Sequence, residues 1–194
     1  NFFNTSFELK RSIIIIDDFY KQPDKIREFA LKQSYKEDLR YYKGFRSEQQ
    51  FLFPNVKESF EKILGKPIMN WAEPGFNGVF QITKECDPLV YHSDIQNYAG
   101  AVYLTPNAPS DGGTSFWKHK RTGIDHSKKD DINNTIFTAE SVIDPTQWEL
   151  LDRVAPKYNR LVIWDGRLVH SASSYESYTK AGLDNRLVQL FFFN

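Results

Sequence analysis

The pattern of apolar positions changes about a third of the way along the chain. Before Gly75, two segments repeat apolar residues at helical spacing, whereas after it short β-branched and aromatic runs alternate with turn residues. The pattern predicts a helical support region over residues 1–75 and a β-rich core over residues 76–194. No linker-like tract separates the two, so we expect one domain over residues 1–194.

Two helices are predicted in the first third, after a short strand over residues 12–17. One helix covers residues 23–34, with Pro23 suited to the first helical position. The other covers residues 54–64, where Gly65 is placed to end it. A further short helix is predicted over residues 145–154.

The rest of the chain is typical of a β-sandwich or barrel. We predict strands over residues 78–83, 90–94, 99–105, 115–117, 159–164, 168–171 and 186–193. The polar stretch 118–134 between them is predicted to be a long mobile loop. The fold class is therefore mainly β (α+β), with the N-terminal helices supporting one face of the β core.

Composition excludes several classes of protein. Apolar residues make up 40% of the chain and charged residues 26%, which is ordinary globular usage. Basic and acidic residues number 25 each, so the formal net charge is zero and extended nucleic-acid binding is not expected. Cys86 is the single cysteine, which favours a reducing, cytoplasmic location. No apolar run reaches the roughly 20 residues of a membrane span.

The candidate chemistry starts from the four histidines, His92, His119, His126 and His170. His92 and Asp94 are two positions apart, so on a strand their side chains share a face. His170 ends a strand–turn–strand segment and is the best third member of a two-histidine, one-carboxylate metal site. His119 and His126 lie in the polar stretch and are expected to be solvated.

The His92–Asp94 pair is weak evidence by itself, because a hydrogen-bonded structural histidine gives the same pattern. Arg186 adds support, since it opens an apolar strand and shares a face with Val188, Leu190 and Phe192. A guanidinium there needs an anion, of the protein or of a ligand. The alternative is that Arg186 marks the solvated end of the strand.

Together these residues resemble the Fe(II)- and 2-oxoglutarate-dependent dioxygenases, particularly the prolyl-hydroxylase-like branch. The resemblance covers about residues 76–193 and extends to small phage and marine oxygenases of unassigned substrate. Besides the metal-site residues and Arg186, the matching motifs are Tyr103-Leu104, Gly112-Gly113-Thr114-Ser115-Phe116, and Arg160-Leu161 with Trp164 shortly before His170.

The resemblance implies a double-stranded β-helix, a cupin-like jelly roll, that hydroxylates its substrate and releases succinate and CO2. Fe(II) would be bound by His92, Asp94 and His170. The co-substrate 2-oxoglutarate would pair its C5 carboxylate with Arg186, and Tyr103 would be a second donor. The family's basic residue usually follows the second histidine by around ten positions, so Lys180 is kept as an alternative to Arg186. The resemblance leaves a protein side chain, an amino acid or a nucleotide as the substrate.

Other functions stay open on the same residues. A jelly roll that binds metal without catalysis would not need Arg186. A hydrolase or isomerase could use the same ligands with zinc or manganese. Within the oxygenases, Asp94 argues against a halogenase, which replaces the carboxylate. The lack of a second arginine over residues 187–193 argues against a nucleic-acid dealkylase.

Overall fold

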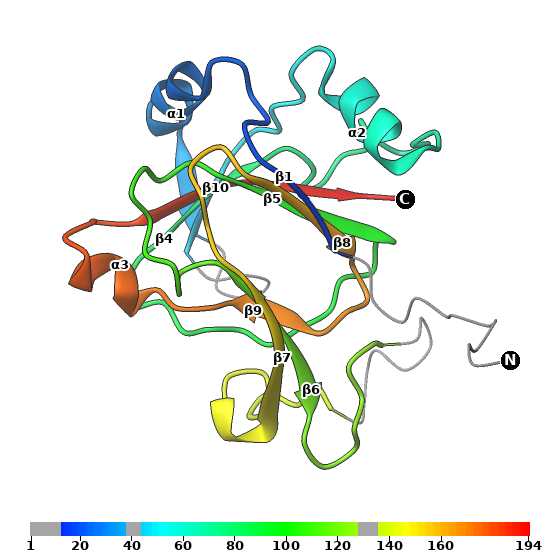
Figure 1. Ribbon diagram of the computed structural model, residues 1–194, viewed down its shortest axis with the longest axis vertical. Coiled ribbons are helices and arrows are strands. Elements are labelled where there is room, and N and C mark those ends of the chain that lie inside the picture. The colour runs from blue at the N-terminus through cyan, green and yellow to red at the C-terminus, as the bar shows by residue number, and fades with distance from the viewer. Residues whose placement is uncertain (1–12, 38–43, 128–135) are drawn as a thin grey trace, which may run out of the picture.

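Two antiparallel sheets face one another in the computed structural model, which describes residues 13–37, 44–127 and 136–194 (Figure 1). Two helices lie against the outer face of the larger sheet, and the site described below lies between the sheets. The predicted mainly β class, with N-terminal supporting helices, is confirmed.

The larger sheet has seven strands in the order β1-β8-β5-β10-β4-β3-β2. Its central strand β10 pairs with β5 on one side and with β4 on the other. Strands far apart in the sequence therefore lie side by side, as in a jelly roll. The bounds are β1 Ile13–Ile16, β2 Tyr35–Glu37, β3 Phe45–Ser47, β4 Phe80–Thr83, β5 Tyr98–Tyr103, β8 Leu161–Asp165 and β10 Arg186–Phe193.

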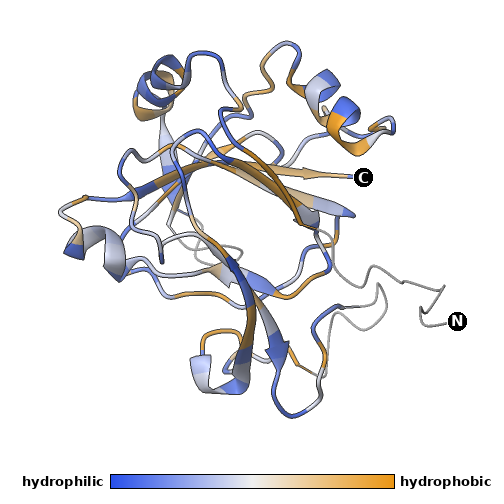
Figure 2. Cartoon of the chain, in the orientation of Figure 1, coloured by the Kyte–Doolittle hydropathy of each residue, from blue (hydrophilic) through white to orange (hydrophobic). Residues whose placement is uncertain are grey.

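The smaller sheet has three strands, β7 (Trp148–Val154), β6 (Thr114–His119) and β9 (His170–Ala172), in that order. The β6–β7 register shifts between Phe116 and Trp117. The apolar core between the sheets joins Phe116 and Val154 to Val162, Trp164 and Val188 of the larger sheet. Figure 2 shows that the central strands of the larger sheet, among them β8 and β10, are hydrophobic over much of their length.

The helices α1 (Pro23–Leu31) and α2 (Val56–Leu64) cover the outer face of the larger sheet. Ala30 of α1 and Phe60 of α2 are completely buried, and the Phe60 ring packs on Phe191 of β10. This second apolar core supports β10, the strand that begins with Arg186, from behind. None of the helices in the described part of the chain has the length and apolar character needed to cross a membrane.

Two predicted elements are wrong. Residues 145–154 form only a 3-10 turn, η1 (Pro145–Gln147), followed by strand β7. The apolar residues of this segment fit a helical period as well as a strand, and pairing with β6 decides between the two. Residues 90–94 are not a regular strand, because only His92 forms a bridge there.

Other elements were missed or differ in extent. Strands β2 and β3 and the short helix α3 (Glu176–Lys180) carry no clear periodic signal at three to five residues each. The predicted loop 118–134 starts two residues later than expected, because Lys118 and His119 belong to β6. Its part over residues 128–134 lies outside the described residues.

Candidate metal and co-substrate site

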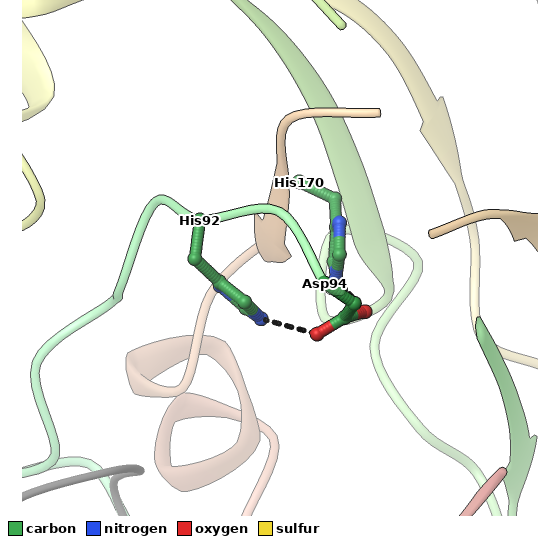
Figure 3. A group of neighbouring side chains, drawn as sticks. All are labelled: His92, Asp94 and His170. Atoms are coloured by element: carbon green, nitrogen blue, oxygen red, sulfur yellow. Dashed lines mark ion pairs between the residues drawn. The ribbon is translucent and has the colours of Figure 1, made fainter. Parts of the chain in front are cut away.

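Three side chains from two segments converge on one point, as Figure 3 shows for His92 and Asp94 on one segment and His170 on the other. Their potential ligand atoms all lie within 4.8 Å of one another. The Nε2 atom of His170 is 3.3 Å from Asp94 Oδ2, and that of His92 is 3.8 Å from Asp94 Oδ1. In the described part of the chain this is the one group of three such residues with metal-binding spacing.

The backbone holds these residues in place although His92 and Asp94 are not on a strand. The His92 N–H donates to the His170 carbonyl at 3.1 Å, and the His170 N–H donates to the His92 carbonyl at 2.8 Å. The Asp94 N–H donates to the Gly166 carbonyl at 2.7 Å. Because Gly166 lies where the chain leaves β8 for β9, the turn between the sheets positions the carboxylate.

Gly166 is needed at this turn because the backbones approach closely. A Cβ atom at this position would lie 2.4 Å from the Gln96 carbonyl oxygen and 3.3 Å from Asp94 Cβ. A larger residue would therefore displace the segment that carries the carboxylate.

Hydrogen bonds to the backbone set the same tautomer in both histidines. The Nδ1 atom of His92 lies 2.9 Å from the Val90 carbonyl oxygen, and Nδ1 of His170 lies 2.7 Å from that of Leu168. A carbonyl oxygen only accepts, so each neutral ring carries its proton on Nδ1. The Nε2 lone pairs are left to face Asp94, which is the arrangement of metal-ligating histidines.

The charge states also suit a cation. Burial, and next the repulsion from His170, lower the pKa of His92 to about 4. Burial raises the pKa of Asp94, but His170 and His92 more than offset this and hold it below its ordinary value. The buried Oδ2 of Asp94 has no hydrogen-bond partner. A neutral His92 imidazole beside an ionised Asp94 carboxylate is a combination that metal binding requires.

The cluster lies in a cavity of about 500 Å³ that also contains Arg186. The cavity is lined by Arg186, Leu190 and Phe192 of β10, which the alternation of side chains along a strand predicted to share one face. Arg186 is only 6% exposed, and its Nε atom is buried without a hydrogen-bond partner. Within the described part of the chain no carboxylate pairs with it, so the cavity holds a buried cation that lacks an anion.

Aromatic hydroxyls surround this guanidinium. Its Cζ atom lies 5.6 Å from the ring centroid of Tyr103, and the Tyr103 hydroxyl shares a 2.7 Å hydrogen bond with Thr114 Oγ1. Burial raises the pKa of Tyr178 to about 12, an effect that the positive charge of Arg186 partly opposes. Thr114 and Tyr175 line the cavity, whereas Tyr103 is not one of its lining residues.

The structure adds Tyr175, Thr114 and Arg46 to the residues expected at the site. Tyr175 lies in a polar segment and Arg46 in one of the missed strands, so the sequence pattern did not single out either. Thr114 lies within the quoted Gly-Gly segment, which was the one available signal for it.

The remaining predicted residues lie elsewhere. His119 is 2% exposed with its ring against Trp148, so its expected solvation is wrong: strand β6 carries it into an aromatic cluster. His126 bonds Asp165 at 3.0 Å, away from the triad. The Lys180 side chain is 69% exposed and pairs with Glu176, and it does not line the cavity.

Comparison of the sequence with known families gives a match to a family without an assigned function. A family of unknown function (DUF6445) matches residues 84–179, which include all three residues of the cluster. No curated protein matches the sequence.

Solved structures show similarity over nearly the whole chain. One is a prolyl hydroxylase from Trichoplax adhaerens in complex with a hypoxia inducible factor peptide, at 10% identity and a TM-score of 0.51, covering 93% of this chain and 83% of that one. Another is HygX from Streptomyces hygroscopicus with nickel and 2-oxoglutarate bound, at 11% identity and a TM-score of 0.50, covering 95% and 83%. At the level of the fold, the chain thus resembles these two proteins, with which it shares the jelly-roll architecture.

Proposed function

We propose that the protein is an Fe(II)- and 2-oxoglutarate-dependent dioxygenase that hydroxylates a small molecule or a protein residue. The observation that carries the proposal is the buried guanidinium of Arg186, which has no acidic partner among the described residues and faces the same cavity as the His92–Asp94–His170 cluster. A metal site alone does not require this cation. A dicarboxylate co-substrate does, because one end can reach the metal while the other pairs with the arginine.

The residues present fit Fe(II). Two imidazole nitrogens and one carboxylate on one side of an ion leave its other positions open, which is the arrangement of non-haem iron oxygenases. His92, Asp94 and His170 would be the ligands. Their Nδ1 protons, bonded to backbone carbonyls, keep both rings in the orientation needed for binding.

The residues also fit 2-oxoglutarate. Arg186 would bind its C5 carboxylate, and Tyr103, whose ring centroid lies 5.6 Å from the guanidinium carbon and whose hydroxyl bonds Thr114, would be a second donor. Trp164 and Leu190 line the same cavity and limit the access of water. When bound, iron and co-substrate supply the oxidation: O2 gives one oxygen atom to the substrate C–H bond and the other to 2-oxoglutarate, which leaves as succinate and CO2.

Anaerobic reconstitution tests the proposal. Fe(II) is added to the intact protein, 2-oxoglutarate is titrated, and the metal-to-ligand absorbance is followed before air is admitted and succinate is measured. We expect saturable absorbance and succinate formation that Zn(II) does not support. Iron binding without a response to 2-oxoglutarate would instead indicate a non-catalytic metal-binding module.

A further inference from the structure

Three of the described residues that line the cavity each have a buried polar atom without a hydrogen-bond partner. The atoms are Oδ2 of Asp94, Nε of Arg186 and Nε1 of Trp164. The proposed function uses the first two, because the carboxylate would bind the metal and the guanidinium would bind the co-substrate. An indole N–H only donates and cannot bind a metal, so Trp164 needs an acceptor that none of the described residues supplies.

Trp164 is held beside the metal cluster. It is 5% exposed, and its ring packs edge-on against that of His170, at 5.1 Å between the centroids, and against that of Phe116, at 5.9 Å. Gly166, two positions further along the chain, accepts the backbone N–H of Asp94. A molecule that accepts a hydrogen bond from the indole therefore lies close to the candidate metal ligands.

This end of the cavity is distant from Arg186. Trp164 and Phe192 both line the cavity, and both pair with Ala99 of β5, one from each side. Phe192 is six positions from Arg186 on β10, which corresponds to about 20 Å of strand. A five-carbon chain spans about 5 Å and an arginine side chain adds about 6 Å, so a co-substrate anchored at Arg186 does not fill the end near Trp164.

The space near Trp164 is narrow and apolar. Trp164 and Phe192 lie on the strands that flank β5, about 10 Å apart at their Cα atoms. Between these strands, Ala99 and Ala101 of β5 carry only methyl groups, and Ala101 lines the cavity. Ile95 also lines it and is 69% exposed, which makes the opening apolar. A flat apolar group fits between two aromatic side chains above such small residues.

We infer that the primary substrate is an uncharged carbonyl compound with a flat apolar body, which lies between Trp164 and Phe192 and accepts a hydrogen bond from Trp164 Nε1. The inference rests on the proposed function and names its substrate class. An indole N–H carries no charge, so it requires an acceptor but no anion. An apolar surface with a fixed donor orients its ligand, and it rejects a molecule without the acceptor because the buried N–H is then left unpaired.

The test compares carbonyl compounds with their methylene counterparts. Acetophenone beside ethylbenzene, and acetanilide beside N-ethylaniline, differ only in a carbonyl group that replaces a methylene group, and all are uncharged at neutral pH. Each is titrated into the intact, isotope-labelled protein loaded with diamagnetic Zn(II) and 2-oxoglutarate, and the four tryptophan indole N–H signals are followed by NMR. We expect at least one carbonyl compound to bind about tenfold or more tightly than its counterpart and to shift the Trp164 signal downfield.

Two variants assign the effect. Trp164→Phe keeps an aromatic ring but removes the donor, so each carbonyl compound should bind no more tightly than its counterpart, and the missing signal identifies Trp164. Trp148→Phe is the matched control, because Trp148 is also buried but its Nε1 donates to the Ser141 carbonyl at 2.8 Å. Trp148 is not one of the cavity's lining residues, so this variant should keep the preference.

Three results would overturn the inference. One is a wild-type protein that binds neither carbonyl compound, or binds each as tightly as its counterpart. Another is a bound carbonyl compound that leaves the Trp164 signal unshifted, because the partner of this N–H is then water. The third is a Trp164→Phe variant that keeps the preference. Failure of the proposed function is seen separately, since the protein would then not bind 2-oxoglutarate, while titrations without 2-oxoglutarate would still report on the Trp164 N–H.

Discussion

Replacing Arg186 by methionine should change stability and co-substrate binding in opposite directions. The Arg186 guanidinium is 6% exposed, has a buried Nε without a partner, and pairs with no carboxylate in the described part of the chain. An unpaired buried charge opposes folding, and an apolar side chain of similar volume removes that penalty. We therefore expect the melting temperature of the ligand-free Arg186→Met variant to equal or exceed that of the wild-type protein.

The ligand-bound protein should behave differently. At a 2-oxoglutarate concentration 100 times its Kd, binding stabilises the wild-type protein by about 2.7 kcal/mol. For a chain of this size that is a rise of about 5–10 °C in Tm. Truncating one partner of a buried charge pair costs about 2–5 kcal/mol, so the variant's Kd should rise at least about thirtyfold. The same 2-oxoglutarate concentration should then stabilise it by less than about 1 kcal/mol.

Thermal unfolding of the Mn(II)-loaded protein, with and without 2-oxoglutarate, measures both effects. Lys180→Met is the matched control, because Lys180 is 69% exposed and paired with Glu176. If Lys180→Met loses the 2-oxoglutarate-dependent rise while Arg186→Met keeps it, the assignment of Arg186 is wrong. A large loss of stability in ligand-free Arg186→Met would refute the reasoning about the unpaired charge.

Three further outcomes are expected. Alanine at any one of the three candidate ligands should abolish stoichiometric Fe(II) binding measured by metal analysis. His119→Ala should keep the iron but lower Tm, because His119 is buried against an aromatic ring. Full iron binding by a ligand variant would show that the replaced residue is not a ligand. Gly166→Ala should weaken metal binding, because the added Cβ would lie 3.3 Å from Asp94 Cβ and 2.4 Å from the Gln96 carbonyl oxygen. An unchanged metal affinity would show that the turn does not position the Asp94 carboxylate. Hydrogen bonds and charge from Arg160 and then Lys157 lower the pKa of Asp17 to about 2. The ion pair of Asp17 therefore stabilises the fold at pH values above the unfolded-state pKa of about 4, and this stabilisation is lost as the pH falls towards 2. Asp17→Asn should thus lower the free energy of unfolding at pH 7 by about 1 kcal/mol or less, and a difference that persists at pH 2 in urea titrations would contradict this cause.

The sequence by itself determined the fold class and the face of the last strand. The β-branched and aromatic runs identified seven of the ten strands in the described part of the chain, and the period of two placed Arg186 with Leu190 and Phe192, because alternation on a regular strand is a local property. The helical spacing before Gly75 likewise identified α1 and α2, which were long enough to show a periodic pattern.

Only the tertiary structure decided how these parts form a site. His92 and Asp94 share a face, but through bridges to His170 and Gly166 rather than through a regular strand, and these contacts join residues more than 70 positions apart. The segment 148–154 became a strand because β6 was available to pair with it. Arg46, Tyr175 and the missing anionic partner of Arg186 emerged only when the two sheets enclosed the cavity, since burial and charge balance depend on contacts across the whole fold.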